Sequence, residues 1–155
     1  MNVEKIADSA SLNIQQLIAE GDFLYRTMDL DLGEMTWDPD LQQTVLPWEP
    51  TPEHQGREGI VHGGVSALFL DTVAGFAANN VVETVGNTAV TVSLSLEYKT
   101  PVPVGAPVLV IATVTGRDGK AIFLTCHIVS ATDPQNVMVK ADVEMLEVRA
   151  EDIKV

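Results

Sequence analysis

Four residues near the middle of the chain have types and spacing that suit acid–base chemistry beside a polarised carbonyl. His62, Gly63 and Gly64 open an apolar segment, and Asp71 lies in the middle of it. A carboxylate among apolar neighbours is either desolvated or faces a cleft, and functional carboxylates concentrate in such settings. We therefore predict that Asp71 is the principal catalytic residue.

The glycine pair offers backbone N–H groups as a second functional element. Glycine is costly at the start of a helix unless something must approach the backbone closely. Free N–H groups and the positive end of the helix dipole bind an oxyanion or a polarised carbonyl. We interpret Gly63 and Gly64 in this way, and close helix packing is the alternative interpretation.

One helix has to position both elements. Residues 60–83 predict a long helix that is apolar nearly all round, and such a helix belongs inside a core. A rise of about 1.5 Å per residue separates Gly63 from Asp71 by about 12 Å, which is too far for both to act on one carbonyl. If they cooperate, a second copy of the helix must run antiparallel, so that Asp71 of one subunit faces Gly63 of the other. The helix therefore predicts a dimer.

The rest of the chain is interpreted as cover for this helix. Before it we expect a short helix from Ser11 to Gly21, a strand over 27–37 and an ordered, proline-containing loop over 38–59. After it, apolar alternation and turn signals predict four strands, over 89–99, 107–116, 121–131 and 137–149.

Two further predictions concern these strands. The last three strands form a meander, and a change of apolar phase near Met145 predicts a bulge in the final strand. The strand over 89–99 alternates regularly, which places Val90, Val92 and Tyr98 on one face and Thr91 on the opposite, polar face.

Length and charge limit the function. The 155 residues are 46% hydrophobic, which supports one domain with one core. Nine basic and 22 acidic residues give a formal charge of -13, which repels nucleic acid and anionic membranes, so we expect neither as a partner. Cys126 is the single cysteine, and no Cys/His cluster has the spacing of a zinc site. We expect no metal and no cofactor.

The sequence also indicates a location. Its first residues lack the apolar run of a signal peptide, and the apolar segment over 61–82 is interrupted by His, Asp and two Asn residues, unlike a membrane span. We predict a soluble protein in a reducing, cytoplasmic compartment.

A buried helix that opens with His-Gly-Gly, preceded by one strand and a loop and followed by four antiparallel strands, resembles the hotdog fold. In that α+β fold a curved antiparallel sheet wraps one long central helix. The resemblance covers residues 25–149, with residues 1–24 as an N-terminal helical extension of a single domain over 1–155. Its most specific part, HQGREGIVHGGVSALFLD, is similar to the PaaI-like acyl-CoA thioesterases, in the branch with a His before His-Gly-Gly.

This resemblance implies hydrolysis of an acyl-CoA to the free acid and coenzyme A, by a homodimer or a homotetramer built as a dimer of dimers. It implies that the Gly63 N–H polarises the thioester carbonyl, helped by His54 from the preceding loop. From the other subunit, Asp71 acts as general base or nucleophile with Thr91 beside it. His62 orients the helix start or approaches the leaving sulfur.

Candidate substrate-binding residues lie near the same motif. Arg57 is the first candidate for the phosphates of coenzyme A because it precedes the helix start, and Gly64 is a second backbone contact. Other basic residues at strand ends are Lys99, Arg117, Lys120, Lys140 and Arg149. An apolar acyl site could be lined by Leu68, Phe69, Phe76 and Trp48.

Two other functions compete with thioester hydrolysis. A hotdog dehydratase or hydratase acting on 3-hydroxyacyl thioesters usually needs a catalytic His paired with an acid in a different motif. A non-catalytic hotdog protein that binds acyl-CoA would gain nothing from a buried, unpaired acid such as Asp71. The acyl group, aliphatic or aryl, stays open.

Overall fold

The structure is a computed structural model that describes residues 4–5 and 32–153 of the chain. The helix predicted after Ser11 lies outside the described residues. In chain order the elements are β1 (Glu4–Lys5), η1 (Leu32–Glu34), β2 (Thr36–Asp38), β3 (Gln43–Trp48), η2 (Pro52–His54), β4 (Gln55–Arg57), β5 (Ile60–Val61), α3 (Gly63–Asn79), β6 (Asn87–Tyr98), β7 (Val108–Asp118), β8 (Ala121–Ser130), β9 (Val137–Arg149) and η3 (Ala150–Asp152).

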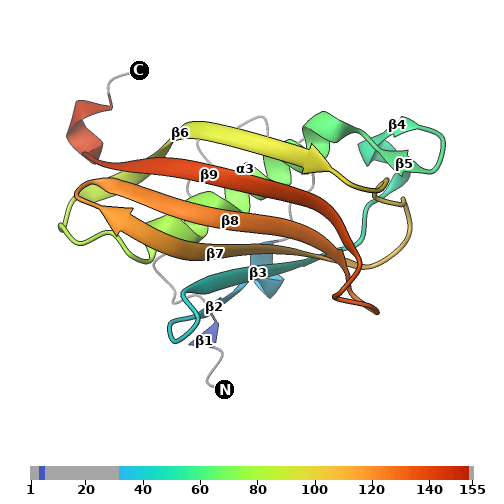
Figure 1. Cartoon of the computed structure of the whole chain (residues 1–155), viewed down its shortest axis with the longest axis horizontal. Helices are drawn as coiled ribbons and strands as arrows, with labels where there is room; N and C mark the ends of the chain where they lie inside the picture. The colour runs from blue at the N-terminus through green and yellow to red at the C-terminus, as the bar shows by residue number, and fades with distance from the viewer. Residues whose placement is uncertain (1–3, 6–31, 154–155) are drawn as a thin grey trace.

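An antiparallel sheet with α3 packed against one face forms the framework of the described chain (Figure 1). Its strand order is β1-β2-β3-β7-β8-β9-β6, and α3 contacts β3, β6, β7, β8 and β9. The predicted α+β arrangement of one sheet around one helix is confirmed. The predicted meander of the last three strands is confirmed as well, whereas β6 forms the outer edge beside β9.

Helix α3 is shorter than the predicted span because side chains close both of its ends. At the start, the Nδ1 atom of His62 accepts the N–H of Gly64 at 2.9 Å, which satisfies one of the free amides of the first turn. At the other end, the side-chain amides of Asn79 and Asn80 donate to backbone carbonyls one turn earlier, at 2.7 and 2.9 Å. Residues 60–61 form β5 instead of helix.

The helix is buried on one face only in the single chain. Its buried residues, which include four with large apolar or β-branched side chains, are Ser66, Phe69, Leu70, Thr72, Val73, Ala74, Ala77 and Ala78. A stripe along the opposite face stays half-buried or exposed: Gly64, Ala67, Leu68, Asp71 and Gly75. The prediction that the helix is buried on all sides is therefore confirmed only for the face that packs on the sheet. We call the opposite face the open stripe.

The loop predicted over 38–59 is wrong in its first part, because β3 occupies Gln43–Trp48 and pairs with β7 along its whole length. Thr44 and Leu46 of this strand are fully buried. Pro47 argued against a strand, since proline cannot donate to a ladder. Strand β2 pairs with β3 only from Gln43 to Val45. Pro47 lies beyond this pairing, so it needs no hydrogen bond toward β2.

The strand predicted over 27–37 lies partly outside the described residues, and its described part is confirmed only at Thr36 and Trp37. Leu32–Glu34 forms a 3-10 helix, and β2 begins only at Thr36. An Asx turn ends β2, because Oδ1 of Asp38 accepts the backbone N–H groups of the second and third residues after it, at 2.9 and 3.1 Å. Local turn chemistry thus overrides the weak alternation seen in the sequence.

Strand β6 contains the bulge that the sequence assigned to the final strand. Thr91 pairs with Met145 and Ser93 pairs with Glu144, so Val92 has no partner on β9. An unpaired residue shifts every later side chain to the other face. Thr91 therefore faces inward with Met145, and the regular alternation predicted for this strand is wrong.

The inward phase of β9 continues past Met145, which is the second correction to the predicted bulge. Glu147 is 2% exposed at the next inward position, and Leu146 faces outward. The Glu147 carboxylate accepts hydrogen bonds from Arg117, from Asn87 at 2.8 Å and from the backbone N–H of Thr84 at 3.0 Å. A polar residue in the expected apolar position is thus fully paired, and it fastens the α3–β6 loop to the β7–β8 hairpin.

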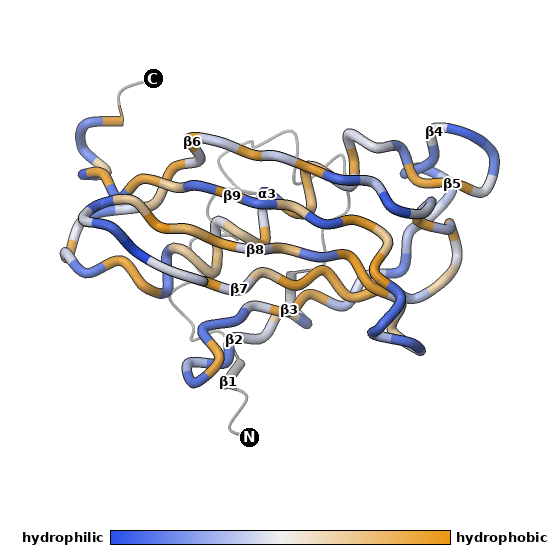
Figure 2. The backbone as a smooth tube through the Cα atoms, viewed as in Figure 1, coloured by the Kyte–Doolittle hydropathy of each residue, from blue (hydrophilic) through white to orange (hydrophobic). Residues whose placement is uncertain are grey.

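Polar and apolar residues alternate along the sheet strands, as the colours of β6 and β9 in Figure 2 show. Within the described part of the chain, no helix is long and apolar enough to cross a membrane. The location of the protein stays a prediction.

The Glu147 network predicts a specific response to acid. Hydrogen bonds from Arg117 and Asn87 lower the pKa of Glu147 from its usual 4.5 to about 2. A lowered pKa stabilises the fold above pH 4.5, and this stabilisation disappears as the pH falls towards 2. We expect Glu147→Gln to lower the melting temperature at pH 7 by about 5 °C and to flatten the decline of stability between pH 5 and pH 2.

The measurement is thermal unfolding followed by circular dichroism across this pH range. Glu144→Gln is the matched control, since Glu144 lies on the outer face of the same strand and forms no ion pair recorded for the described residues. Equal pH profiles for the two variants would contradict the assignment.

Candidate active site

The backbone at the start of α3 forms a fixed frame around one open donor. The N–H of His62 donates to the carbonyl of His54 at 2.9 Å, and the carbonyl of His62 accepts two helix N–H groups at 2.9 and 3.2 Å. The N–H of Gly64 is bound by the His62 side chain. Among the described residues, no acceptor is recorded for the N–H of Gly63. This N–H lies at the positive end of the helix dipole and suits an anionic or polarised oxygen.

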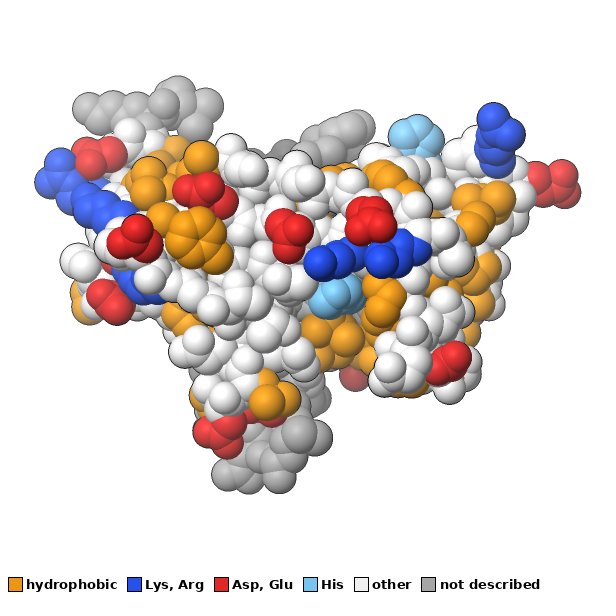
Figure 3. Space-filling view, viewed as in Figure 1, with side chains coloured by type: hydrophobic (Ala, Val, Ile, Leu, Met, Phe, Trp, Pro, Cys, Tyr) orange, Lys and Arg blue, Asp and Glu red, His pale blue; other side chains and the backbone are white. Residues whose placement is uncertain are grey.

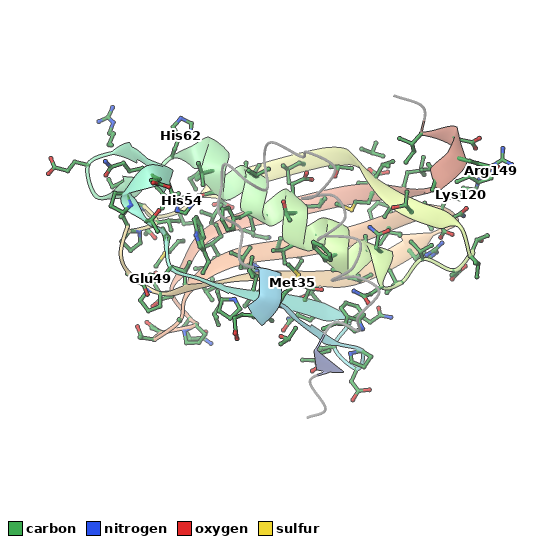
Figure 4. The ribbon with its side chains drawn as sticks, turned by 180° about the vertical axis from the view of Figure 1, so that it is seen from behind. Met35, Glu49, His54, His62, Lys120 and Arg149 are labelled. Atoms are coloured by element: carbon green, nitrogen blue, oxygen red, sulfur yellow. The ribbon has the colours of Figure 1, made fainter. Side chains whose placement is uncertain are left out.

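His54 lies beneath this helix start. Its side chain is buried, and its Nδ1 accepts the backbone N–H of Thr51 at 2.9 Å, so a neutral ring carries its proton on Nε2. The ring packs edge-on against Trp48 and Phe69, with centroids 5.4 and 5.9 Å away. His54 and His62 lie at the same end of α3 in Figure 4. The structure thus brings the predicted residues His54, His62 and Gly63 together at the start of α3, which we call the helix mouth.

Asp71 and Thr91 form the second group of predicted site residues. The hydroxyl of Thr91 donates to Oδ1 of Asp71 at 2.7 Å. The contact exists because the bulge at Val92 turns Thr91 toward the helix. Asp71 is half-buried on the open stripe of α3, so its carboxylate is accessible from outside the single chain.

The two groups are separate within one chain. Gly63 and Asp71 are two helical turns apart, about 12 Å along the helix axis. One carbonyl group cannot contact both of them. A complete site therefore needs the Asp71 of one copy beside the Gly63 of another, or only one of the two groups takes part.

The predicted substrate-binding residues differ in accessibility. Phe69 is 2% exposed and stacks on Trp48 with centroids 3.9 Å apart, so it belongs to the core beneath the helix mouth. Leu68 is half-buried on the same stripe as Asp71, and Gly64 is exposed. Arg57 is exposed on β4, opposite Ile60 of β5.

The other basic candidates are less suited to a phosphate at the helix start. Arg117 is bound to Glu147 and donates to two backbone carbonyls, at 2.9 and 3.0 Å. Lys99 pairs with a glutamate at 3.6 Å. Lys120 and Arg149 lie at the far end of α3 from His62 (Figure 4). For Arg57, no ion pair with another described residue is recorded.

Tyr98 is a contact residue of the helix mouth that the sequence did not reveal. Its hydroxyl donates to the carbonyl oxygen of Gly63 at 2.7 Å. A Cβ atom on Gly63 would lie 3.2 Å from that hydroxyl oxygen, which is tighter than an ordinary contact. Regular alternation placed Tyr98 opposite to Thr91, and only the bulge puts both on the helix side.

Cys126 is unsuited to nucleophilic chemistry. Burial, with smaller contributions from Asp142 and Asp71, raises the pKa of the Cys126 thiol to about 12, so the thiol stays protonated. Burial and the nearby Lys140 lower the pKa of His127. Within residues 4–5 and 32–153, no group of three or more His, Cys, Asp or Glu side chains is arranged to hold a metal ion.

Sequence comparison identifies similar proteins. A sequence profile described as the thioesterase superfamily matches residues 58–136, about half of the chain. The acyl-coenzyme A thioesterase THEM4 of Xenopus laevis is 32% identical over 92 residues, which cover 59% of this chain and 40% of that protein. The chain spans less than half the length of the curated relatives it matches.

Solved structures share the fold. Zebra fish thioesterase superfamily member 2 aligns with a TM-score of 0.68 at 17% identity, over 87% of this chain and 96% of that one. The PaaI protein from the phenylacetic acid degradation operon of E. coli aligns with a TM-score of 0.68 at 16% identity, over 89% and 93%. The predicted hotdog fold is confirmed by these similarities.

The cap at the helix start can be tested directly. His62→Ala removes the side-chain acceptor for the Gly64 N–H, whereas His62→Asn keeps an acceptor at the same position. We expect the alanine variant to lower the free energy of unfolding by about 1 kcal/mol and the asparagine variant to change it little. Urea denaturation measures both. An equal loss in both variants would show that the imidazole stabilises by packing on Gly56 instead of capping.

Proposed function

Since the chain belongs to the thioesterase superfamily, we propose that it hydrolyses an acyl-CoA to the free acid and coenzyme A. The relatives named acyl-coenzyme A thioesterases support this substrate class. The proposal assigns the Gly63 N–H to the carbonyl oxygen of the thioester and Asp71 to the chemical step.

The observation that carries the proposal is the open N–H of Gly63 within a fixed backbone frame. Attack on a thioester carbonyl moves negative charge onto its oxygen, and a preorganised donor stabilises that charge without reorganising. The neighbouring peptide groups are all bound, to His54, to His62 and to Tyr98. The donor therefore keeps its direction while the charge develops.

Asp71 supplies the basic group. As a general base, its carboxylate takes a proton from water while the water oxygen bonds to the carbonyl carbon. As a nucleophile, it bonds to that carbon itself and water later hydrolyses the anhydride. In both routes the carbon–sulfur bond breaks and coenzyme A leaves as the thiolate. The thiolate takes up a proton from the protonated Asp71 carboxyl in the first route and from water in the second. The Thr91 hydroxyl, 2.7 Å from Oδ1, fixes the direction of the carboxylate in either case.

We further propose that the site forms between two copies of the chain. Strand β6 is an unpaired edge of the described sheet, and Val92 on it is 57% exposed, which invites pairing with another strand. The open stripe of α3 lies beside this edge. A Cβ on Gly75 would only touch a methionine methyl at 3.9 Å, so intrachain packing does not require this glycine. A partner helix approaching closely would require it.

Arg57 is the proposed contact for the phosphates of coenzyme A. It is exposed on β4, and β5 leads directly into the helix start. Leu68 is the proposed acyl contact on the open stripe, and Phe69 belongs to the buried core on which the helix packs. A thiol-release screen with short, medium, long-chain and aryl acyl-CoAs tests the function and identifies the acyl group. Absence of release from all of them would overturn the proposal.

The first functional prediction concerns Asp71. Asp71→Asn keeps the shape of the side chain and removes the base, so we expect kcat to fall by about 10²- to 10⁴-fold with little change in KM. Steady-state kinetics with the best acyl-CoA from the screen provide the measurement. Asp142→Asn is the control, because it removes the same charge from an exposed position on β9. A folded Asp71→Asn protein with a near-normal rate would exclude the assigned mechanism.

The second prediction concerns the shared site. In a mixed dimer of one Asp71→Asn chain and one Gly63→Pro chain, one of the two active sites combines an intact Gly63 with an intact Asp71, and the other contains both substitutions. Random exchange of the two inactive proteins should restore about a quarter of the wild-type activity. Gly63→Ala is the matched control for the proline variant, since both add a Cβ near Tyr98 but alanine keeps the N–H.

Subunit exchange is verified by native mass spectrometry of isotopically labelled chains. If exchange is complete and activity does not recover, each site lies within one chain. The Cβ of Gly63→Ala presses on Tyr98, so a partial loss is expected there, but its N–H remains. If Gly63→Pro keeps as much measurable activity as Gly63→Ala, the N–H of Gly63 is not the carbonyl donor.

A further inference from the structure

Tyr98, the last residue of β6, is tied to the peptide group that follows the proposed carbonyl donor. Its hydroxyl donates to the Gly63 carbonyl oxygen at 2.7 Å, although the side chain is otherwise 53% exposed. A carbonyl oxygen has two lone pairs and can accept this bond in addition to a helical one. The bond therefore adds to the helix and replaces nothing in it.

The Gly63–Gly64 peptide group is consequently held at both ends. Tyr98 binds its carbonyl oxygen, and Nδ1 of His62 binds its N–H at 2.9 Å. The preceding peptide group is held as well, because its carbonyl accepts two helix N–H groups. The N–H of Gly63 belongs to this preceding group, and fixing the following group limits the rotation of the preceding one about the backbone bonds of Gly63.

Such fixation matters because glycine has the widest backbone freedom of all residues. At Gly63 a Cβ would lie 3.2 Å from the hydroxyl oxygen of Tyr98 and 3.3 Å from its Cζ, so Tyr98 would have to move by a few tenths of an ångström to accommodate a side chain. The close approach of Tyr98 thus favours glycine at this position, and the hydrogen bond of Tyr98 restricts the backbone freedom that glycine brings.

We propose that Tyr98 is a positioning residue for the thioesterase reaction: it holds the Gly63–Gly64 peptide group so that the Gly63 N–H points at the thioester carbonyl oxygen. This inference rests on the proposed function. Tyr98 acts through Gly63 and does not exchange a proton with substrate, because its hydroxyl proton is already shared with a backbone oxygen.

The test uses Tyr98→Phe, which removes only the hydroxyl group. Donor direction matters most when charge has developed on the substrate oxygen, so we expect kcat to fall roughly tenfold with KM changed less than twofold. The matched control is Thr88→Val. Thr88 lies on the same strand and donates from its hydroxyl to Asn79 of the same helix at 2.9 Å, but at the far end of it.

Thr88→Val therefore removes an equivalent link between β6 and α3 away from the helix mouth. We expect it to lower stability about as much as Tyr98→Phe and to leave kcat unchanged. Equal losses of kcat in both variants, or unchanged kcat in Tyr98→Phe, would overturn the inference.

A readout independent of activity separates this inference from the proposed function. In protein labelled with ¹⁵N-glycine, the amide signals of Gly63 and Gly64 should shift and exchange faster with solvent in Tyr98→Phe, and not in Thr88→Val. Unchanged glycine amides would overturn the positioning role even if kcat fell. If the wild-type protein released no thiol from any acyl-CoA, the proposed function would fail, whereas the amide signals would still decide whether Tyr98 holds the helix mouth.

Discussion

Two hydroxyl groups on β6 hold α3 at the two places where chemistry is proposed. Thr91 binds the carboxylate of Asp71, and Tyr98 binds the carbonyl of Gly63. The two residues are seven positions apart, so a regular strand would turn one of them away from the helix. The unpaired Val92 between them restores a common face. The bulge at Val92 is thus the constraint on which both halves of the proposed site depend.

Much of the fold could be predicted because the burial of apolar side chains stabilises it, and their spacing in the sequence indicates helices and strands. The helix in residues 60–83 and the four strands after it follow apolar patterns that match their observed spans within a few residues. Strand β3 could not be predicted in this way. Its apolar alternation is short, and Pro47 suggests a loop. Only the structure reveals that the pairing with β2 ends at Val45, before the proline. The burial of Glu147 in β9 could not be predicted either, since a charged residue breaks the apolar pattern. Its burial is possible because hydrogen bonds within the fold replace those it makes with water.

The candidate site could be predicted in residue types but not in geometry. Spacing alone indicated that Gly63 and Asp71 are too far apart on one helix, and the structure keeps them apart. The positions of His54, His62 and Tyr98 at the start of α3 depend on contacts between separate segments of the chain. Two hydrogen bonds make this point: His62 to the His54 carbonyl, and Tyr98 to the Gly63 carbonyl 35 residues earlier. No periodic pattern encodes such contacts.

The negative charge of the chain bears on the choice of the proposed anionic substrate. The formal charge is -13, and acidic and basic side chains are scattered over the face in Figure 3 instead of forming one basic stripe. Screening limits the reach of exposed charges to about 8 Å at physiological salt. A small anion at the proposed site would meet the α3 dipole and Arg57, with Glu53 and Glu58 also exposed in the same segment, whereas an acidic protein would face a broad surface of like charge. We infer that the surface charge disfavours an acyl group presented on an acidic carrier protein and leaves a free coenzyme A thioester as the proposed substrate.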